Sequence, residues 1–250
     1  MKKTALITGS TSGIGRATAQ LFAKQGVRLI LCGRREERLK ELTSELQKLT
    51  DVKTLRFDVR DKNEVFEAIH SLPKEFSEID ILINNAGNAH GLDPIQTGSV
   101  EDWDAMLDIN VKGLLYVTKA ILPNMLERKS GHIINIGSTA GKEVYPNGNV
   151  YCASKHAVDA LNQAMRIDLN GKGIKVAAIN PGMVATEFSE VRFKGDKERA
   201  SKVYQGFTPL KAEDIADIIW FTVTRPPHVN IADLTVMSLD QASSTIVNKQ

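Results

Sequence analysis

Residues 4–15 read Thr4-Ala5-Leu6-Ile7-Thr8-Gly9-Ser10-Thr11-Ser12-Gly13-Ile14-Gly15, an apolar segment followed at once by a glycine-rich turn. The apolar segment predicts a buried strand, and the residues after the turn continue with the period of a helix. Glycines between a strand and a helix allow a tight turn and let backbone N–H groups approach a pyrophosphate, which the positive end of the helix dipole also favours. The turn therefore predicts phosphate contacts, for which the candidates are Gly9, Ser10, Thr11, Ser12, Gly13, Ile14 and Gly15.

The glycine spacing differs from the common G-x-G-x-x-G dinucleotide motif. Three residues separate the first two glycines and one separates the last two. The alternative interpretation is a plain strand–helix turn without a ligand. The position of the turn after the first strand favours the phosphate site.

Short apolar segments alternate with longer helical patterns along the rest of the chain. The predicted strands are residues 4–8, 28–32, 54–58, 79–84, 132–137, 175–180 and 234–237, and the predicted helices are 14–25, 35–49, 61–75, 101–128, 150–170 and 212–223. This alternation predicts an α/β fold with a doubly wound, Rossmann-type parallel sheet of about seven strands and helices on both faces. No linker or break in composition divides the chain, so we expect residues 1–250 to form one domain.

Charge and cysteine usage exclude several classes of function. The 250 residues carry 32 basic and 30 acidic side chains and no basic block, so nothing indicates a nucleic-acid or membrane partner. Cys32, Cys152 and the five histidines are scattered, which predicts neither a metal site nor a disulfide framework. Met1-Lys2-Lys3 leads directly into a strand, without a signal-like or membrane-length apolar segment. We therefore expect a cytoplasmic location.

The end of the second predicted strand indicates which nicotinamide cofactor the chain prefers. An acidic residue there binds the ribose 2′-hydroxyl of NAD, whereas arginine accommodates the 2′-phosphate of NADP. This chain has Cys32-Gly33-Arg34-Arg35 and no carboxylate. Two cations at the start of a helix oppose its dipole and need a compensating anion. Neighbouring Glu36 and Glu37 are one candidate for that anion, and a bound 2′-phosphate, which Arg34 and Arg35 would hold, is the favoured one.

Tyr151 and Lys155 lie four positions apart in Tyr151-Cys152-Ala153-Ser154-Lys155, and Ser138 lies thirteen positions upstream of the tyrosine. On a helix, this spacing places both side chains on one face. A free tyrosine has a pKa of about 10, and a nearby cation lowers it, so the pair predicts a general acid/base. The spacing is common by chance, and it gains meaning only beside a cofactor site.

The combination of glycine turn, Ser138, Tyr151 and Lys155 resembles the short-chain dehydrogenase/reductase family over residues 4–240. Further matches are Asn84-Asn85-Ala86-Gly87, Asp108-Ile109-Asn110-Val111, and Pro181-Gly182 with Thr186. The resemblance implies further cofactor contacts from Asp58, Val59, Asn85, Ala86, Gly87, Tyr151, Lys155, Pro181, Gly182, Val184 and Thr186.

The resemblance also implies catalytic roles. Tyr151 would exchange a proton with the substrate oxygen, Lys155 would lower the tyrosine pKa and hold the nicotinamide ribose, and Ser138 would hydrogen-bond the carbonyl. Asn110 stands inside a predicted helix, where asparagine is mildly unfavourable. It marks either a local kink or, as in the family, a water-linked proton relay to Lys155. Ser138 alone would otherwise be an ordinary loop or capping serine.

Residues 187–211 are charged, contain few apolar residues and follow the sixth strand. Because ligands bind beyond the carboxyl ends of the strands in such folds, we expect a substrate lid here, with a solvated surface excursion as the alternative. Arg192 is the candidate that binds a substrate carboxylate together with Ser138 and Tyr151, and Lys194 is the weaker one. Alternatively, Arg192 pairs with Glu187, Glu190 or a neighbouring subunit.

The lid and the segment before Tyr151 resemble a subgroup of NADP-dependent 3-hydroxy acid dehydrogenases. This resemblance implies hydride transfer between NADP and the 3-hydroxyl, 3-keto or aldehyde carbon of small acids such as serine, allo-threonine or 3-hydroxypropionate. A carbonyl or 3-ketoacyl reductase with another substrate is the first alternative, and a non-catalytic NADPH-binding scaffold is the remote one. The family also implies a homotetramer or homodimer through residues 101–128 and 150–170. The tail, Ser243–Gln250, is either frayed or docked on a neighbour.

Overall fold

The computed structural model describes residues 2–250 and contains one seven-stranded sheet. Its strands are β1(Thr4–Thr8), β2(Arg28–Gly33), β3(Val52–Arg56), β4(Ile81–Asn84), β5(Gly131–Ile136), β6(Ile174–Pro181) and β7(Asp233–Val236). All neighbouring strands are parallel, in the order β3-β2-β1-β4-β5-β6-β7. The predicted fold class is therefore confirmed, and the strand boundaries differ from the prediction by at most two residues.

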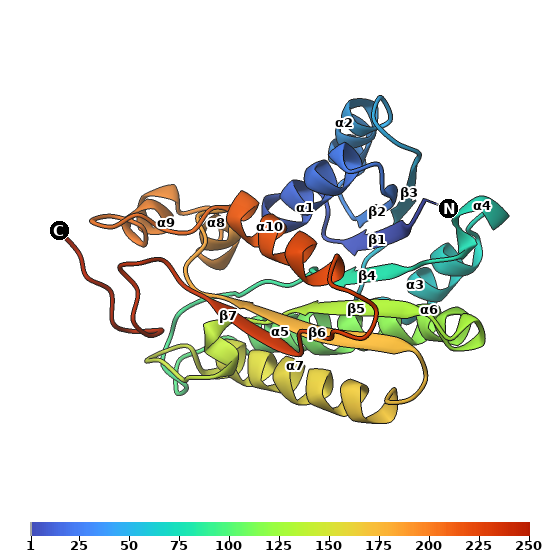
Figure 1. The fold of residues 1–250 in the computed structure, drawn as a ribbon. Coiled ribbons are helices and arrows are strands. Elements are labelled where there is room, and N and C mark those ends of the chain that lie inside the picture. Colours follow the sequence, from blue (N-terminus) through green and yellow to red (C-terminus); the bar gives the residue numbers. More distant parts are fainter. Residues whose placement is uncertain (1) are drawn as a thin grey trace.

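Helices cover both faces of the sheet (Figure 1). They are α1(Gly13–Lys24), α2(Glu36–Leu46), α3(Lys62–His70), α4(Lys74–Ser77), α5(Val100–Leu107), α6(Leu114–Arg128), α7(Asn149–Asp168), α8(Phe188–Arg192), α9(Lys197–Lys202) and α10(Ala212–Val223), with a π-helical segment η1(Asp108–Gly113) and a 3₁₀ turn η2(Thr139–Gly141). Helices α1, α2 and α10 pack on one face, and α3 and α6 pack on the other. This two-sided cover explains why the strands are almost continuously apolar.

Two predicted helices are interrupted in the structure. The predicted helix over 61–75 ends at His70, and a separate short helix, α4, begins after Pro73. Proline has no N–H to donate and disfavours helical backbone in the residue before it, which accounts for the break. The predicted helix over 101–128 contains the π-helical segment η1, with Asn110 inside it.

The lid segment over 187–211 contains two short helices, α8 and α9, that the sequence did not predict. The capping residue Asp196 accepts a hydrogen bond from the backbone N–H of Arg199 at 2.9 Å, and this bond helps such a short helix to form. In Figure 1 the lid helices lie at the opposite end of the sheet from the N-terminus, and the chain ends beside them.

The strand order reverses between β1 and β4, the two neighbours at the middle of the sheet. Such a reversal leaves a crevice outside the carboxyl ends of the strands, because the connections on the two sides lead away from each other. The glycine turn after β1 and Asn85 after β4 meet at this crevice. The topology thus brings segments that are distant in sequence to one place.

Candidate active site

A cavity of about 630 Å³ lies at the carboxyl ends of the strands. Most of the predicted site residues line it, namely Gly9, Thr11, Ser12, Gly13, Ile14, Arg34, Arg35, Asp58, Val59, Asn85, Ala86, Gly87, Ser138, Tyr151, Lys155, Pro181, Gly182, Val184, Thr186 and Arg192. Three predicted residues, Ser10, Gly15 and Asn110, are not part of the cavity wall. Each of the three contacts a residue of the wall: Ser10 bonds to Cys32, Gly15 packs against Gly9, and Asn110 bonds to Asn88.

The glycine turn is packed too closely for side chains. Gly9 and Gly13 have left-handed backbone, with φ of 64° and 48°. A Cβ on Gly13 would lie 3.2 Å from Thr186, which directly precedes the lid. A Cβ on Gly15 would collide with the carbonyl oxygen of Gly9. Asn85 fixes the turn from the other side, because its amide donates to the carbonyl oxygens of Thr8 at 2.8 Å and Gly9 at 3.2 Å.

Ser10 differs from its expected role as a phosphate contact. It is fully buried, and both its hydroxyl and its backbone N–H donate to the carbonyl oxygen of Cys32 at 3.1 Å. The serine therefore ties the turn to the end of β2 instead of facing the cavity. Helix α1 begins at Gly13 without a side-chain cap and without acidic residues in its first turn, so its N-terminal N–H groups suit an anion.

Arg34 and Asp58 lie together at the ends of β2 and β3. Arg34 Nη1 is 3.4 Å from the carboxylate of Asp58, which Arg60 also binds at 2.6 Å. Burial tends to raise the pKa of Asp58, but hydrogen bonds from Arg60 and the charges of both arginines hold this pKa below its ordinary value. The carboxylate therefore remains ionised between the two cations.

Arg35 faces the glycine turn. Its Nε and Nη2 donate to the hydroxyl oxygen of Thr11 at 3.1 and 2.9 Å, and Nη2 also donates to Ser12 Oγ at 2.8 Å. Its Nη1 donates to the carboxylate of Glu187 at 2.9 Å. Within residues 2–250, neither Arg34 nor Arg35 forms an ion pair with Glu36 or Glu37. These two glutamates pair with Lys40, and Glu36 also pairs with Arg56. Glu36 and Glu37 do lie in the first turn of α2, where their charges favour the helix dipole, but they form no direct ion pair with Arg34 or Arg35.

Tyr151 and Ser138 meet in the inner part of the cavity. Tyr151 lies on α7 and is only 8% exposed, and Ser138 precedes η2 at the end of β5. Burial raises the pKa of Tyr151 well above its ordinary value, and the neighbouring Tyr145 hydroxyl adds to this effect. A hydrogen bond with Ser138 and the charge of Arg192 act in the opposite direction.

Lys155 has a different environment from the one expected. Its ammonium donates to the carbonyl oxygen of Ile136 at 2.9 Å, and burial lowers its pKa to about 8. The groups that lower the Tyr151 pKa are Ser138 and Arg192, and Lys155 is not among them. The ammonium is thus directed toward the end of β5, and the expected effect of Lys155 on the pKa of Tyr151 stays a prediction.

Asn110 lies behind the cavity in the π-helical segment. Its amide nitrogen donates to the carbonyl oxygen of Asn88 and to Ser154 Oγ, both at 2.9 Å, and its Oδ1 accepts from the backbone N–H of Asn88 at 2.9 Å. These bonds fix the loop after β4 against α7. The helix is thus irregular at Asn110, as the prediction of a local kink implied. The side chain of Asn110 forms these contacts next to Gly87 and Lys155.

Arg192, on α8, lies directly beside the catalytic candidate Tyr151. Its guanidinium carbon is 5.5 Å from the ring centre of Tyr145 and 5.6 Å from that of Tyr151. Its Nε donates to the carbonyl oxygen of Gly91 at 3.0 Å, and its own carbonyl accepts from the N–H of Gly91 at 3.0 Å. Of the alternative partners, Glu187 binds Arg35 and Arg38 instead, and Glu190 forms no ion pair with Arg192.

Lys194, the weaker candidate for the substrate carboxylate, is engaged elsewhere. Its ammonium lies 3.0 Å from the carboxylate of Asp102 on α5, and the lysine does not line the cavity. This finding leaves Arg192 as the lid cation that faces the cavity.

Several residues of the cavity wall were missed by the sequence analysis: Asn88, Tyr145, Glu187, Tyr204, Gln241, Ser244 and Lys249. Tyr145 had a sequence signal because it lies shortly before the helix that carries Tyr151, and Glu187 and Tyr204 lie within the predicted lid. The others reach the cavity through tertiary folding. The tail contacts its own chain at two points: the N–H of Gln250 donates to the carbonyl oxygen of Gly206 at 2.8 Å, and that of Ser244 donates to the carboxylate of Glu143 at 2.9 Å.

Comparison with known proteins now assigns this geometry to a family. The family model described as short chain dehydrogenase matches residues 3–197. The chain belongs to the short-chain dehydrogenase family.

Individual members of the family are similar to this chain over almost its full length. The NADP-dependent 3-hydroxy acid dehydrogenase YdfG of Salmonella typhi is 48% identical over 95% of both chains. Sulfoacetaldehyde reductase 2 of Chromohalobacter salexigens is 46% identical over 98% of this chain and 97% of the relative. The solved closed form of serine dehydrogenase complexed with NADP⁺ superimposes with a TM-score of 0.93 at 46% identity, covering 99% of this chain and 100% of the other. The resemblance to NADP-dependent 3-hydroxy acid dehydrogenases is confirmed.

No helix among residues 2–250 is long and apolar enough to cross a membrane.

Proposed function

We propose that this protein is an NADP-dependent oxidoreductase that acts on small 3-hydroxy acids such as serine, allo-threonine or 3-hydroxypropionate, and on the corresponding 3-oxo acids. The observation that carries the proposal is the position of Arg192, whose guanidinium lies beside the ring of Tyr151 inside the cavity. A guanidinium binds a carboxylate through two parallel hydrogen bonds. A substrate with an anion at one end and a hydroxyl or carbonyl at the other can therefore span the two side chains.

The named relatives act on substrates of this shape. Serine and other 3-hydroxy acids place a carboxylate near the reacting carbon, and sulfoacetaldehyde places a sulfonate near an aldehyde. The two anions differ, but both suit the forked donor geometry of arginine. This shared chemistry supports anion recognition by Arg192.

The cavity fits a dinucleotide. Gly9 and Gly13 line the cavity, a Cβ on either would press against Asn85 or Thr186, and the start of α1 offers N–H groups for a pyrophosphate. Arg34 and Arg35 would hold the 2′-phosphate, and Asp58 with Val59 would flank the adenine. Asn85, Ala86, Gly87 and the 181–186 segment would line the nicotinamide half, together with Tyr151 and Lys155.

When bound, NADP supplies the hydride acceptor, and NADPH the donor, for the carbon that carries the reacting oxygen. Ser138 hydrogen-bonds this oxygen and orients it toward the Tyr151 hydroxyl. The raised pKa keeps Tyr151 protonated near neutral pH, so the phenol can donate its proton when a carbonyl is reduced. In the oxidation direction, Ser138 and Arg192 lower the cost of removing that proton.

A kinetic screen tests the proposal. L-serine, L-allo-threonine and 3-hydroxypropionate are oxidised with NADP⁺ or NAD⁺, and malonic semialdehyde, sulfoacetaldehyde and an acetoacetyl thioester are reduced with NADPH. We expect a higher kcat/KM for the anionic short-chain substrates and for NADP⁺. A higher kcat/KM for the acetoacetyl thioester would favour the 3-ketoacyl reductase instead, and cofactor binding without any turnover would favour the scaffold.

Assembly and location complete the proposal. We infer a homotetramer or homodimer through α5, α6 and α7, supported by the family relationship, and size-exclusion chromatography with light scattering tests it. A single domain over residues 1–250, with the lid within it, is supported by the continuous sheet. A reducing cytoplasm is supported by the two free, buried cysteines, Cys32 and Cys152.

A further inference from the structure

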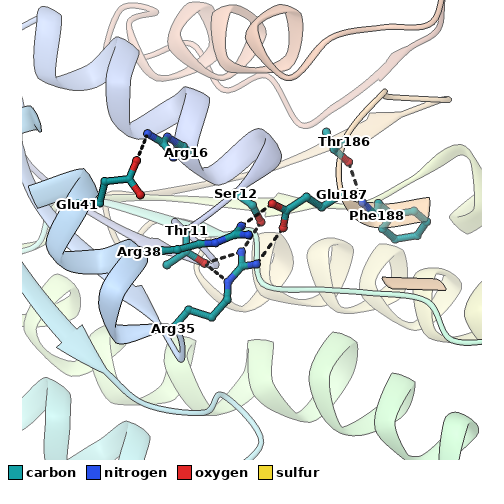
Figure 2. A network of polar contacts seen from close by, with 9 residues as sticks. All are labelled: Thr11, Ser12, Arg16, Arg35, Arg38, Glu41, Thr186, Glu187 and Phe188. Carbon is teal, nitrogen blue, oxygen red and sulfur yellow. Dashed lines mark hydrogen bonds and ion pairs between the residues drawn. The ribbon is translucent and has the colours of Figure 1, made fainter. Parts of the chain in front are cut away.

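Glu187 connects the lid to the start of α2 through two arginines (Figure 2). Its Oε2 accepts from Arg35 Nη1 at 2.9 Å, and its Oε1 accepts from Arg38 Nη1. Partial burial opposes ionisation, but the hydrogen bonds from both arginines hold the pKa of Glu187 below its ordinary value. The lid therefore places a full negative charge against the cation that the proposed NADP site offers to phosphate.

Arg35 does not need Glu187 to keep its position. Its Nε and Nη2 are already held by the hydroxyls of Thr11 and Ser12 on the glycine turn. The group that points to Glu187 is the remaining nitrogen, Nη1. Arg35 and Glu187 both line the cavity, whereas Arg38 does not. A phosphate that approaches Arg35 in the cavity thus meets the carboxylate of Glu187 on the same guanidinium.

We propose that Glu187 sets cofactor selectivity by competing with the 2′-phosphate of NADP for Arg35. This inference rests on the proposed phosphate site at Arg34 and Arg35. The carboxylate weakens the binding of NADP and leaves NAD, which has no 2′-phosphate, unaffected. Arg38 limits the competition, because it draws the carboxylate toward a cation outside the cavity.

The effect of Glu187 on the affinity for the 2′-phosphate should be small, because the ion pair between Arg35 and Glu187 is partly exposed to solvent. The side chains of Arg35 and Glu187 are 42% and 38% exposed, so water and salt screen the pair. Ion pairs of this kind have small interaction energies, which correspond to changes in affinity of about two- to fivefold. We expect this increase in affinity when the charge of Glu187 is removed, and we expect it to decrease at high salt.

The test uses the full chain and two probes, 2′,5′-ADP and 5′-AMP, which differ only in the 2′-phosphate. Isothermal titration calorimetry measures both for wild type, Glu187→Gln and the matched control Glu190→Gln. Glu190 lies on the same helix, is exposed, and pairs with no cation among residues 2–250. We expect Glu187→Gln to bind 2′,5′-ADP about two- to fivefold more tightly, with binding of 5′-AMP unchanged and the control equal to wild type.

A second variant tests the role of Arg38. Without Arg38, Glu187 can pair only with Arg35 and competes more strongly with the phosphate. Arg38→Gln should therefore weaken 2′,5′-ADP binding in the wild-type background. It should have a smaller effect in a double variant that also carries Glu187→Gln. If Arg38→Gln weakened 2′,5′-ADP binding equally in both backgrounds, Arg38 would act directly on the phosphate. The proposal that Glu187 competes for Arg35 would then be wrong.

Two further outcomes separate failure of the inference from failure of the phosphate site. If Glu187→Gln weakens the binding of 2′,5′-ADP and of 5′-AMP alike, Glu187 holds the lid closed and does not compete with the phosphate, and the inference is wrong. If Arg35→Gln leaves 2′,5′-ADP binding unchanged, Arg35 does not bind the 2′-phosphate. The proposed competition by Glu187 is then wrong as well. If Arg35→Gln weakens 2′,5′-ADP by about tenfold or more but Glu187→Gln changes nothing, only the role of Glu187 is refuted.

Discussion

The guanidinium carbon of Arg192 lies 5.6 Å from the ring centre of Tyr151, although the two residues belong to different helices, α8 and α7. A cation over the face of a buried aromatic ring is attracted by the ring electrons. The contact places the proposed anion-binding group and the proposed proton donor at the two ends of a short substrate. It also makes the proton affinity of the tyrosine depend on the lid, since the Arg192 charge lowers the pKa of Tyr151.

Replacing Arg192 by alanine should therefore change both binding and pH dependence. Loss of charge-assisted hydrogen bonds to the carboxylate raises the KM for L-serine by about ten- to a hundredfold. Removing the cation also raises the pKa of Tyr151 further, so the pH profile of oxidation should move to higher pH. Lys194→Ala, two positions along the lid, is the matched control and should leave both quantities unchanged. An unaltered KM in Arg192→Ala would remove this residue from the substrate site.

Replacing Tyr151 by phenylalanine removes a single hydroxyl. Because this hydroxyl is the proposed proton donor, kcat should fall by about 10²- to 10⁴-fold. Binding of NADPH, measured by fluorescence titration, should remain near the wild-type value. Tyr116→Phe, on α6 and outside the cavity wall, serves as the control. Near-normal turnover in Tyr151→Phe would disprove the assignment.

Replacing Arg34 by glutamate should reverse part of the cofactor preference. The new carboxylate repels the 2′-phosphate of NADP and can accept a hydrogen bond from the ribose 2′-hydroxyl of NAD. We expect the ratio of kcat/KM for NADP⁺ over NAD⁺ to fall by about tenfold or more. Arg56→Glu, on the neighbouring strand β3 and outside the cavity wall, controls for the general change in charge. A ratio that does not change would argue against phosphate binding at Arg34.

Lys155 should make the cofactor-free protein more stable at alkaline pH. Burial lowers its pKa to about 8, below the ordinary lysine value, so between these two values the unfolded chain binds more protons than the folded one. The contribution of Lys155 to the free energy of unfolding should therefore rise with pH across this window, by roughly 3 kcal/mol. Urea unfolding of wild type and Lys155→Met at pH 8 and pH 10 measures the effect. The variant should lack the rise, whereas Lys172→Met, at an exposed position, should retain it.

His132 should make the protein sensitive to acid. The ring is buried in β5, neither nitrogen has a hydrogen-bond partner among residues 2–250, and burial lowers its pKa to about 3. As pH falls below the ordinary histidine value, the unfolded chain takes up a proton that the folded chain does not. The free energy of unfolding therefore falls, with a contribution of roughly 2 kcal/mol between pH 8 and pH 5.

The variant His132→Leu isolates this contribution. Leucine cannot titrate and leaves no unpaired nitrogen, so the variant should be more stable than wild type, and its advantage should grow toward acidic pH. His228→Leu, at an exposed position, is the control and should follow the wild-type pH dependence. An advantage of His132→Leu that is the same at pH 5 and pH 8 would contradict the depressed pKa.

Local sequence patterns predicted the elements of the fold well. The apolar segments that became strands are short and bounded by turns, and the first one, Thr4–Thr8, was predicted with its observed bounds. The predicted helix over 61–75 is longer than the observed one, because its helical pattern continues past Pro73, where the chain breaks into α3 and α4. The lid helices α8 and α9 were missed because they are short and carry few apolar residues, so their stability depends on contacts with the rest of the chain.

Side-chain roles were predicted less completely than elements. Tyr151, Ser138 and the glycines of the turn are where a local motif places them. Ser10 belongs to the same motif, yet it turns away from the cavity toward Cys32, and no local pattern reports that direction. Glu187 appeared only as a possible partner of Arg192, and the structure pairs it with Arg35 and Arg38 instead.

Local sequence patterns alone predict the order of strands and helices, the glycine turn after β1, and the tyrosine and lysine on one helix face. These features depend on neighbours within a few residues, where backbone geometry and periodicity act directly. Only the tertiary structure decided which charges meet: Arg192 with Tyr151, Arg35 with Glu187, and Lys155 with the carbonyl of Ile136. Long polar side chains from separate elements choose partners by proximity and burial, and both arise only when the sheet, the lid and the tail have packed together.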